Sequence, residues 1–259
     1  MRKIKLLLLS VCLSVCVLSS AHNVITKNEQ STSSNDTIPH TTYLVSVGIS
    51  DYPGEDLDLK LPVNDAKTIT WVFSKNKKLK YSQLLNEEAT KENILKSVDK
   101  LFSMASENDV VLLFYSGHGN GEGFEVYDTV LRYDEIRQRM SKSKCNNKMI
   151  FADACFSGRI RTNDKANEES LSDKETNVML FLSSRSNELS SEISYMSNGF
   201  FTTYLQKALR GAADSDKNRI ITAKELFDYV HPNVVKISKD RQHPVMWGNF
   251  SDDMPVIKW

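Results

Sequence analysis

Neither sign of charge predominates in the 259-residue sequence, because 33 Lys and Arg residues balance 33 Asp and Glu residues. This balance gives no support to a nucleic-acid-binding protein or to one that adsorbs to an anionic membrane surface. The sequence has no CxxC or HxxxH spacing, which disfavours a zinc site. It also lacks an internal repeat, and its length suits one large domain, alone or with extensions.

The amino-terminal apolar stretch is too short to span a bilayer comfortably, since that takes roughly 20 residues. This stretch, Leu6–Leu18, follows a basic start and precedes the small residues Ser19–Ala21. The order is typical of a signal peptide over residues 1–21. We therefore expect an exported chain, secreted or periplasmic, without stable membrane insertion. An uncleaved membrane anchor is the alternative that the same residues leave open.

Only four cysteines are present, and Cys12 and Cys16 lie within the predicted signal peptide. The other two, Cys145 and Cys155, would be able to form one disulfide in an oxidising compartment. Cys145 lies in a polar loop sequence, whereas Cys155 follows an apolar run, so a bridge would require the chain to double back. We therefore expect two free thiols.

The remaining chain divides into a leader and one domain. Residues 22–40 are rich in Ser, Thr and Asn and are typical of a disordered leader, which leaves 41–259 as the domain. Its first half alternates apolar runs with amphipathic stretches, which predicts a parallel sheet covered on both faces. Strands are expected at 41–49, 81–85 and 110–115, and helices at 57–74 and after Thr90. The second half predicts a hairpin or strand and then a helix within 124–140, followed by strands near 149–155 and 177–183. Helices are expected at 199–209 and 223–230, and edge elements at 244–247 and 254–259.

Two of the predicted strands end on residues that can do chemistry. The apolar run Val110–Tyr115 is followed by Ser116, Gly117, His118 and Gly119, and the run that starts at Met149 is followed by Asp153, Ala154 and Cys155. Open α/β sheets bind their ligands at the carboxyl ends of the strands. If the two strands are parallel neighbours, His118 and Cys155 lie side by side at this edge.

A cysteine and a histidine in this position suit nucleophilic catalysis. The thiolate of Cys155 would attack, the imidazole of His118 would take the thiol proton, and the same imidazole would later protonate a leaving amine. The backbone N–H groups of Gly119 and Cys155 would converge on the developing oxyanion. Taken singly, a buried cysteine or a histidine is more often structural. The matching positions of the two residues at strand ends favour the catalytic interpretation.

The motifs around these residues carry a family resemblance. YSGHG at Tyr115–Gly119, followed by DACFSG at Asp153–Gly158, resembles the paired signature of caspase-fold cysteine peptidases, especially metacaspases and their bacterial relatives. The segment Leu59–Ile69 is similar to the family's N-D-A segment, with Pro62 where a cysteine is common, and Ser183–Glu188 is similar to the segment after the next strand. The resemblance implies an α/β caspase-like three-layer sandwich with a mostly parallel six-stranded sheet between helices.

The resemblance also implies roles for individual residues. It makes His118 the general base and Cys155 the nucleophile of an endopeptidase that cuts peptide or protein substrates after Arg or Lys. Asp153 and Asp65 correspond to the acidic floor of the pocket for that basic side chain, with Ser116 on its wall. Carboxylates suit this task because a buried guanidinium or ammonium group needs a partner charge. The alternative is that Asp153 caps a turn and Asp65 caps a helix.

If the enzyme prefers basic residues, the polar stretch at 159–175 is itself a candidate cleavage site. It is expected to be an exposed loop, and it contains basic residues shortly after the predicted nucleophile. Self-cleavage in this loop is therefore a hypothesis.

The stretch Asp214–Glu225 fits the template of an EF-hand calcium loop at several positions. The candidate ligands are Asp214, Asp216, Asn218 and Glu225. Arg219 departs from the template, because the sharp turn there favours Gly. Thr222 and Glu225 also form a capping box for the next helix, which explains half of the pattern without a metal.

The leading interpretation is a monomeric, exported cysteine endopeptidase that requires no cofactor, with calcium as a possible ligand. Two alternatives remain open from the sequence. One is a catalytically silent caspase-like module that binds peptides or partner proteins, and the other is a calcium-binding interaction protein built around the 214–225 loop. Hydrolysis of a peptide ending in Arg or Lys would separate the enzyme from both.

Overall fold

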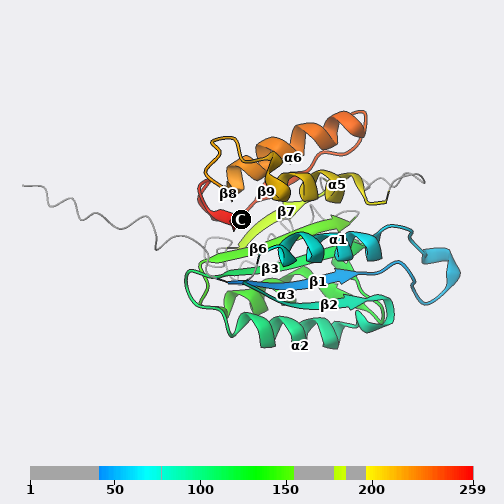
Figure 1. Ribbon diagram of the computed structural model, residues 1–259. Helices are drawn as coiled ribbons and strands as arrows, with labels where there is room; N and C mark the ends of the chain where they lie inside the picture. The colour runs from blue at the N-terminus through cyan, green and yellow to red at the C-terminus, as the bar shows by residue number, and fades with distance from the viewer. Residues whose placement is uncertain (1–40, 77, 155–177, 185–196, 259) are drawn as a thin grey trace, which may run out of the picture. The chain divides into compact units, whose positions relative to one another are not determined.

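A six-stranded sheet lies at the centre of the computed structural model, which describes residues 41–76, 78–154, 178–184 and 197–258 (Figure 1). All of these residues belong to one compact unit, Ser34–Trp259. In spatial order the strands are β2 (Leu79–Leu85), β1 (Thr42–Gly48), β3 (Val110–Gly117), β6 (Asn147–Ala154), β7 (Val178–Leu182) and β9 (Val245–Trp247). Neighbouring strands are parallel except β9, which is antiparallel to β7. The predicted mostly parallel six-stranded sheet is confirmed.

The central strands are buried on both sides. Every residue of β1, β3 and β7 is buried, as are the residues of β6 after Asn147. Their side chains point alternately to two separate hydrophobic clusters, one on each face of the sheet. Val111 and Leu113 belong to one cluster, while Leu112 and Phe114 belong to the other. Uninterrupted apolar runs are therefore required in these strands, because neither face contacts water.

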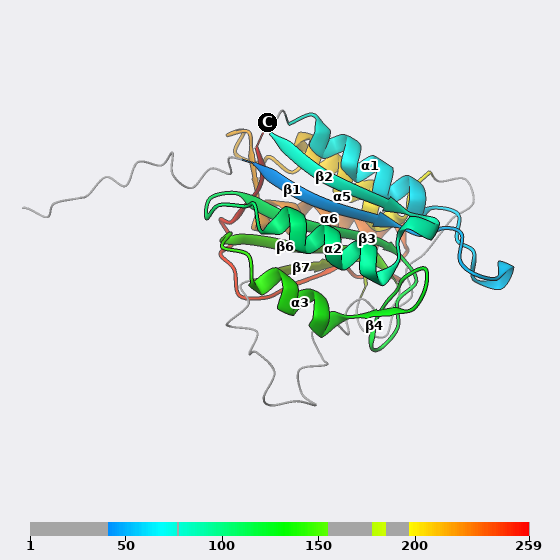
Figure 2. The ribbon, with the colours of Figure 1, turned by 90° about the horizontal axis from the view of Figure 1, so that it is seen from below.

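Helices cover both faces of the sheet and complete the three-layer sandwich. Figure 1 shows one face under α1 (Pro62–Ser74), α5 (Phe200–Lys207) and α6 (Ala223–Ile237). The other face is covered by α2 (Lys91–Phe102) and α3 (Tyr133–Ser141) (Figure 2). Helix α2 begins as predicted, since the Thr90 hydroxyl accepts a hydrogen bond from Asn93 N at 3.3 Å. Short elements are η1 (Glu55–Leu57), η2 (Asn86–Glu88), the hairpin of β4 (Gly123–Glu125) and β5 (Val130–Arg132), η5 (Ala208–Ala212), β8 (Ile220–Thr222) and β10 (Pro255–Lys258).

Two predictions near the carboxyl end were wrong, one in the length of a helix and one in the pairing of a strand. The helix expected at 223–230 continues to Ile237, with Pro232 inside it. Val230 and Val234 are both buried, so packing of the apolar face outweighs the preference of proline for a helix boundary. The segment expected at 254–259 as an edge of the sheet instead contains β10, which pairs with β8 in a separate two-stranded sheet.

Cys145 is a free thiol, as predicted. Its side chain is fully buried, although the residues next to it in sequence are polar. Its Sγ donates a hydrogen bond to Asp109 O at 2.7 Å. Burial raises the pKa of this thiol to about 11. Cys145 precedes the amino end of β6, and Cys155 follows its carboxyl end, so the two are separated in sequence by a strand about 25 Å long. In the described part of the chain, no helix has both the length and the apolar character needed to cross a membrane.

Candidate active site

The candidate site lies at the carboxyl edge of the sheet, where β3 and β6 end together. The two strands are parallel neighbours, and their register pairs Ser116 with Asp153 and Gly117 with Ala154. His118 is the next residue after β3. Ala154 is the last described residue before Cys155, which itself lies outside the described residues. The predicted adjacency of the two strand ends is therefore confirmed, while the position of the sulfur stays a prediction.

The imidazole of His118 is held through one ring nitrogen. Its Nε2 lies 2.8 Å from the backbone oxygen of Leu57, in the short η1 helix that follows β1. A carbonyl oxygen can only accept, so this contact places the proton of a neutral imidazole on Nε2. Nδ1 then carries the lone pair and can accept a proton. The side chain of His118 is partly exposed, which leaves it open to a substrate.

Gly119 presents its N–H away from the neighbouring hairpin. Two hydrogen bonds flank it, from Glu125 N to His118 O and from Asn120 N to Gly123 O, each 3.0 Å long. This pattern makes Gly119 and Phe124 a non-hydrogen-bonded pair of an antiparallel bridge. In such a pair the N–H and C=O groups point outward, so the N–H of Gly119 is free of the hairpin and suits the predicted role of an oxyanion donor.

The two predicted pocket carboxylates lie close enough to interact. Asp65 on α1 and Asp153 on β6 are 1 % and 7 % exposed. The carboxylate of Asp65 accepts hydrogen bonds from the Ser116 hydroxyl at 2.9 Å, Asn198 Nδ2 at 2.8 Å and Gly199 N at 3.1 Å. These donors are all neutral. Burial raises the pKa of Asp65 well above its usual value, and repulsion from Asp153 raises it further.

The predicted alternative, in which Asp65 caps a helix and Asp153 caps a turn, is not seen at α1, the helix that carries Asp65. Asp65 lies inside the first turns of α1, whose N-cap is Leu61. Both carboxylates instead face the start of α5, because Asp65 accepts from Gly199 N and Asp153 accepts from Thr202 N at 3.2 Å and from its hydroxyl at 2.9 Å. The N-terminus of a helix stabilises negative charge. The beginning of α5 thus holds two carboxylates at one place on the sheet edge.

Three residues of this arrangement were not predicted from the sequence. Asn198 and Gly199 precede α5, and Thr202 lies in its first turn. A Cβ atom on Gly199 would overlap Oδ2 of Asp153, so only glycine allows this close approach. The Asn-Gly dipeptide directly before an apolar helix is the one sequence signal for this contact.

The structure also brings together the predicted calcium loop. Ligand atoms of Asp214, Asp216 and Glu225 lie within 4.8 Å of one another, and Arg219 adopts a positive φ of 67° at the position where the template favours Gly. The carboxylate of Asp214 accepts from Asn218 N and Arg219 N, each at 3.1 Å. Asn218 uses its Oδ1 to accept from Ile220 N at 2.7 Å.

Glu225 has a structural role that needs no ion. Its carboxylate accepts from Thr222 N at 3.1 Å and Ser215 N at 3.0 Å, and both halves of the predicted capping box are present. Bonds from the loop to its own carboxylates account for the observed geometry, so calcium binding stays a prediction.

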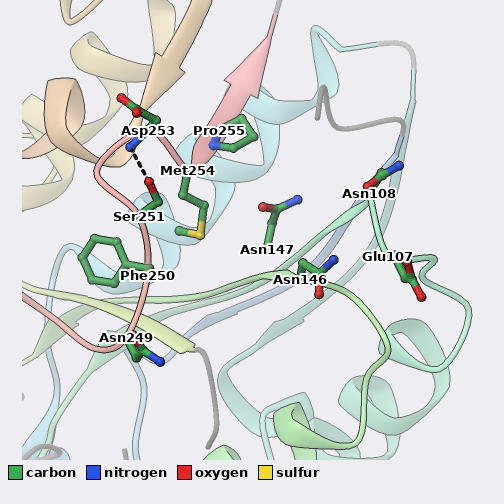
Figure 3. A pocket seen from close by; sticks show the side chains of 10 residues that line it. All are labelled: Glu107, Asn108, Asn146, Asn147, Asn249, Phe250, Ser251, Asp253, Met254 and Pro255. Atoms are coloured by element: carbon green, nitrogen blue, oxygen red, sulfur yellow. Dashed lines mark hydrogen bonds between the residues drawn. The ribbon is translucent and has the colours of Figure 1, made fainter. Parts of the chain in front are cut away.

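A separate cavity of about 770 Å³ lies at the opposite edge of the sheet (Figure 3). Its walls come from the loops that precede β3 and β6 and from the segment before β10, and they include Glu107, Asn108, Asn146, Asn147, Phe250 and Met254. The eight residues of β3 separate this cavity from His118, a distance of about 25 Å. The cavity is therefore not part of the candidate active site.

Fold and site together define an α/β protein with an imidazole and two buried carboxylates at the carboxyl edge of a mostly parallel sheet. Residues 43–254 match the C14 peptidase family described as the caspase domain, and the chain belongs to this family of cysteine-type peptidases.

Similarity to individual proteins agrees with this family. The chain is 33 % identical to "Metacaspase-1A" of Neurospora crassa over 100 residues, which cover 33 % of this chain and 22 % of that protein. The crystal structure of caspase-1 from Spodoptera frugiperda aligns with a TM-score of 0.63 at 15 % identity, over 84 % of this chain and 90 % of that one. A protein of Geobacter sulfurreducens aligns with a TM-score of 0.62 at 17 % identity, over 82 % and 94 %. The two solved structures show the fold alone.

Proposed function

We propose that the protein is a cysteine endopeptidase in which Cys155 is the nucleophile and His118 the general base. The observation that carries this proposal is the register of β3 and β6, which pairs Gly117 with Ala154 immediately before these two residues. Consecutive Cα atoms are about 3.8 Å apart and neighbouring strands about 4.8 Å apart, so the chain leaves both strands at adjacent points. Membership of a cysteine peptidase family supports the same assignment.

The reaction follows from the contacts of His118. Nδ1 takes the proton of the Cys155 thiol, and the thiolate attacks the peptide carbonyl carbon. The oxyanion that forms accepts hydrogen bonds from the N–H groups of Gly119 and Cys155. The imidazolium returns its proton to the leaving amine, and water then hydrolyses the acyl-enzyme with His118 as base. Leu57 O keeps the neutral ring in the tautomer with Nδ1 unprotonated, and it can also accept from Nε2 of the imidazolium.

We further propose that cleavage occurs after Arg or Lys. The support is electrostatic, because Asp65 and Asp153 are buried together and each raises the cost of charge on the other. A guanidinium or ammonium group brought between them offsets that cost and supplies donors to carboxylate oxygens. Ser116 adds a hydroxyl beside Asp65.

The test is hydrolysis of short fluorogenic peptides that end in Arg, Lys or Asp, with wild-type protein, Cys155→Ala and His118→Ala. We expect the wild type to cleave the Arg and Lys peptides in buffer containing EDTA, and both variants to lose the activity. Equal cleavage of the Asp peptide would contradict the specificity. If folded wild-type protein hydrolyses none of the three peptides, the assignment as an enzyme is contradicted. The alternative of a catalytically silent, peptide-binding module then remains.

Two further steps belong to the same proposal. Export would remove residues 1–21, and amino-terminal sequencing of protein purified from the producing cell tests this point. Self-cleavage would occur after basic residues in the 159–175 stretch, which lies outside the described residues. Mass spectrometry should then find fragments that end at Arg159, Arg161, Lys165 or Lys174 in the wild type but not in Cys155→Ala. Fragments that form in both proteins would exclude self-processing.

A further inference from the structure

Two buried tyrosines contact the peptide groups on either side of His118. Tyr52, in the segment after β1, is 5 % exposed, and Tyr115 on β3 is 1 % exposed. The hydroxyl oxygen of Tyr52 accepts a hydrogen bond from His118 N at 2.9 Å, while the hydroxyl of Tyr115 donates to His118 O at 2.7 Å. The two hydroxyl oxygens are 3.3 Å apart. His118 is therefore held at both its N–H and its C=O by side chains from different segments.

The two hydrogen bonds to the peptide groups of His118 can both form with both phenols protonated. Each hydroxyl has one proton to donate. The Tyr115 hydroxyl lies 2.7 Å from both His118 O and Glu125 O, and the Tyr52 hydroxyl lies 3.1 Å from Glu125 O. When Tyr115 donates to His118 O, Tyr52 can donate to Glu125 O while it accepts from His118 N. Burial raises the pKa of Tyr52 to about 12 and that of Tyr115 well above its usual value. The pair therefore stays neutral over the range in which a thiol and an imidazole exchange a proton.

The surrounding residues restrict His118 further. The rings of Tyr52 and His118 have their centroids 5.0 Å apart at an interplanar angle of 49°, and Leu57 O fixes Nε2. A Cβ atom on Gly117 would approach the hydroxyl oxygens of Tyr52 and Tyr115 to 2.6 and 2.7 Å, which explains the glycine before the histidine. The chain segment 52–57 thus contacts His118 at its peptide N–H, its ring face and its Nε2.

We propose that Tyr52 and Tyr115 are positioning residues, which hold the main chain of His118 so that its imidazole can reach the Cys155 thiol. The proposal rests on the assignment of His118 and Cys155 in the proposed function. Neither tyrosine touches the substrate in this account, and neither contacts Asp65 or Asp153 in the hydrogen bonds described above. Their removal should therefore change the rate of the chemical step and not the binding of the basic side chain.

The two tyrosines should differ in their effect. Tyr52→Phe leaves the peptide N–H of His118 without its acceptor, and a displacement of a catalytic group by about 1 Å can cost on the order of 100-fold in rate. We expect kcat to fall about 10-fold or more with KM unchanged. Tyr115→Phe leaves His118 O with its second donor, Glu125 N at 3.0 Å, so we expect a loss of only about threefold.

The experiment combines kinetics with a measurement that needs no turnover. The rate of iodoacetamide alkylation of Cys155, followed by peptide mass spectrometry from pH 5 to 9, reports the pKa of the thiol in each variant. A nearby imidazolium stabilises the thiolate, so displacement of His118 should move the midpoint to higher pH. Tyr43→Phe is the matched control, because the buried Tyr43 hydroxyl donates to Met104 O at 3.0 Å in a contact that does not involve His118.

We expect a higher alkylation midpoint and a lower kcat in Tyr52→Phe, and wild-type values of both in Tyr43→Phe. A midpoint in Tyr52→Phe equal to that of Tyr43→Phe would overturn the proposal, even if both variants lost activity through general destabilisation. If the wild type cleaves none of the test peptides, the proposed function fails on that result. The alkylation midpoints then still decide whether Tyr52 sets the position of His118.

Discussion

Replacement of Asp65 by Asn would remove one buried charge and keep the size of the side chain. Asp65 is 1 % exposed and accepts hydrogen bonds from Ser116 Oγ, Asn198 Nδ2 and Gly199 N. The oxygen of an asparagine can retain the two nitrogen donors. Its NH₂ group would then face the Ser116 hydroxyl, which can accept as well as donate. The substitution therefore keeps a partner for each of the three groups that contact Asp65, and the fold should tolerate it.

Cleavage after Arg should nevertheless decrease. Removal of one partner of a buried charge pair costs about 2–5 kcal/mol. Since Asp153 would still face the substrate cation in the proposed pocket, we expect the lower end, about 2–3 kcal/mol. At about 1.4 kcal/mol per factor of ten, kcat/KM for an Arg peptide falls roughly 30- to 150-fold. Steady-state hydrolysis of Arg and norleucine peptides measures the effect, and the norleucine peptide should lose much less.

The same variant should gain stability at neutral pH. Burial, and then Asp153, raise the pKa of Asp65 above its unfolded value of about 3.9. The stability contributed by the protonated form is therefore present below about pH 4 and is lost as the pH rises through the raised pKa. The asparagine in the variant would have no proton to lose. Urea unfolding should show Asp65→Asn to be at least as stable as the wild type at pH 7.5, with the difference smaller at pH 4.5.

Two outcomes would refute this reasoning. Unchanged kcat/KM for the Arg peptide in folded Asp65→Asn would exclude Asp65 from substrate binding. A loss of stability at pH 7.5 larger than at pH 4.5 would show that the folded protein favours the charged carboxylate. Asp228→Asn serves as the matched control, because Asp228 is an exposed carboxylate on α6, paired only with the exposed Lys224 among the contacts described, and its loss should leave kcat/KM unchanged and alter stability only slightly.

Three further variants test other parts of the structure. Gly199→Ala should displace the Asp153 carboxylate, and kcat/KM for Arg peptides should fall about tenfold. Urea unfolding should show a loss of about 1–3 kcal/mol in stability. Full activity would contradict the close approach of Gly199 to the Asp153 carboxylate. Glu225→Ala should cost about 1 kcal/mol in EDTA through loss of the capping box, whereas a loss seen only with calcium would support an ion in this loop. Cys145→Ala should keep full activity and should reduce the decline of stability between about pH 9 and 11. The reason is that burial raises the thiol pKa to about 11, so the stability that the protonated thiol contributes is lost as the pH rises through that value. Thermal melts with an unchanged decline would contradict this prediction.

The sheet and the position of His118 could be predicted from local sequence. Long apolar runs in β3 and β6 required burial on both faces, and the glycines beside His118 marked the end of β3. Parallel pairing then placed both ends at one edge. The length of α6 could not be read in the same way, because packing of Val234 outweighed the local signal of Pro232.

The contacts that orient the site depend on residues far apart in sequence. Asp65 meets Gly199 across 134 residues, and Tyr52 meets His118 across 66. Periodicity carries no information about such pairs. The grouping of Asp65 with Asp153 was available only through resemblance to a family, and the roles of Tyr52 and Thr202 were not available at all. Hydroxyl-to-peptide contacts of this kind are fixed by tertiary structure and leave no pattern in the sequence.

Covalent labelling tests most directly whether Cys155 and His118 act together on a basic substrate. A peptide with a carboxyl-terminal arginyl chloromethyl ketone should form one adduct on the wild type, and peptide mass spectrometry should locate it on Cys155. The rate should fall at least 100-fold in His118→Ala and strongly in Asp65→Asn. Labelling of Cys155 at an equal rate in His118→Ala, or an adduct on Cys145 instead, would contradict the account.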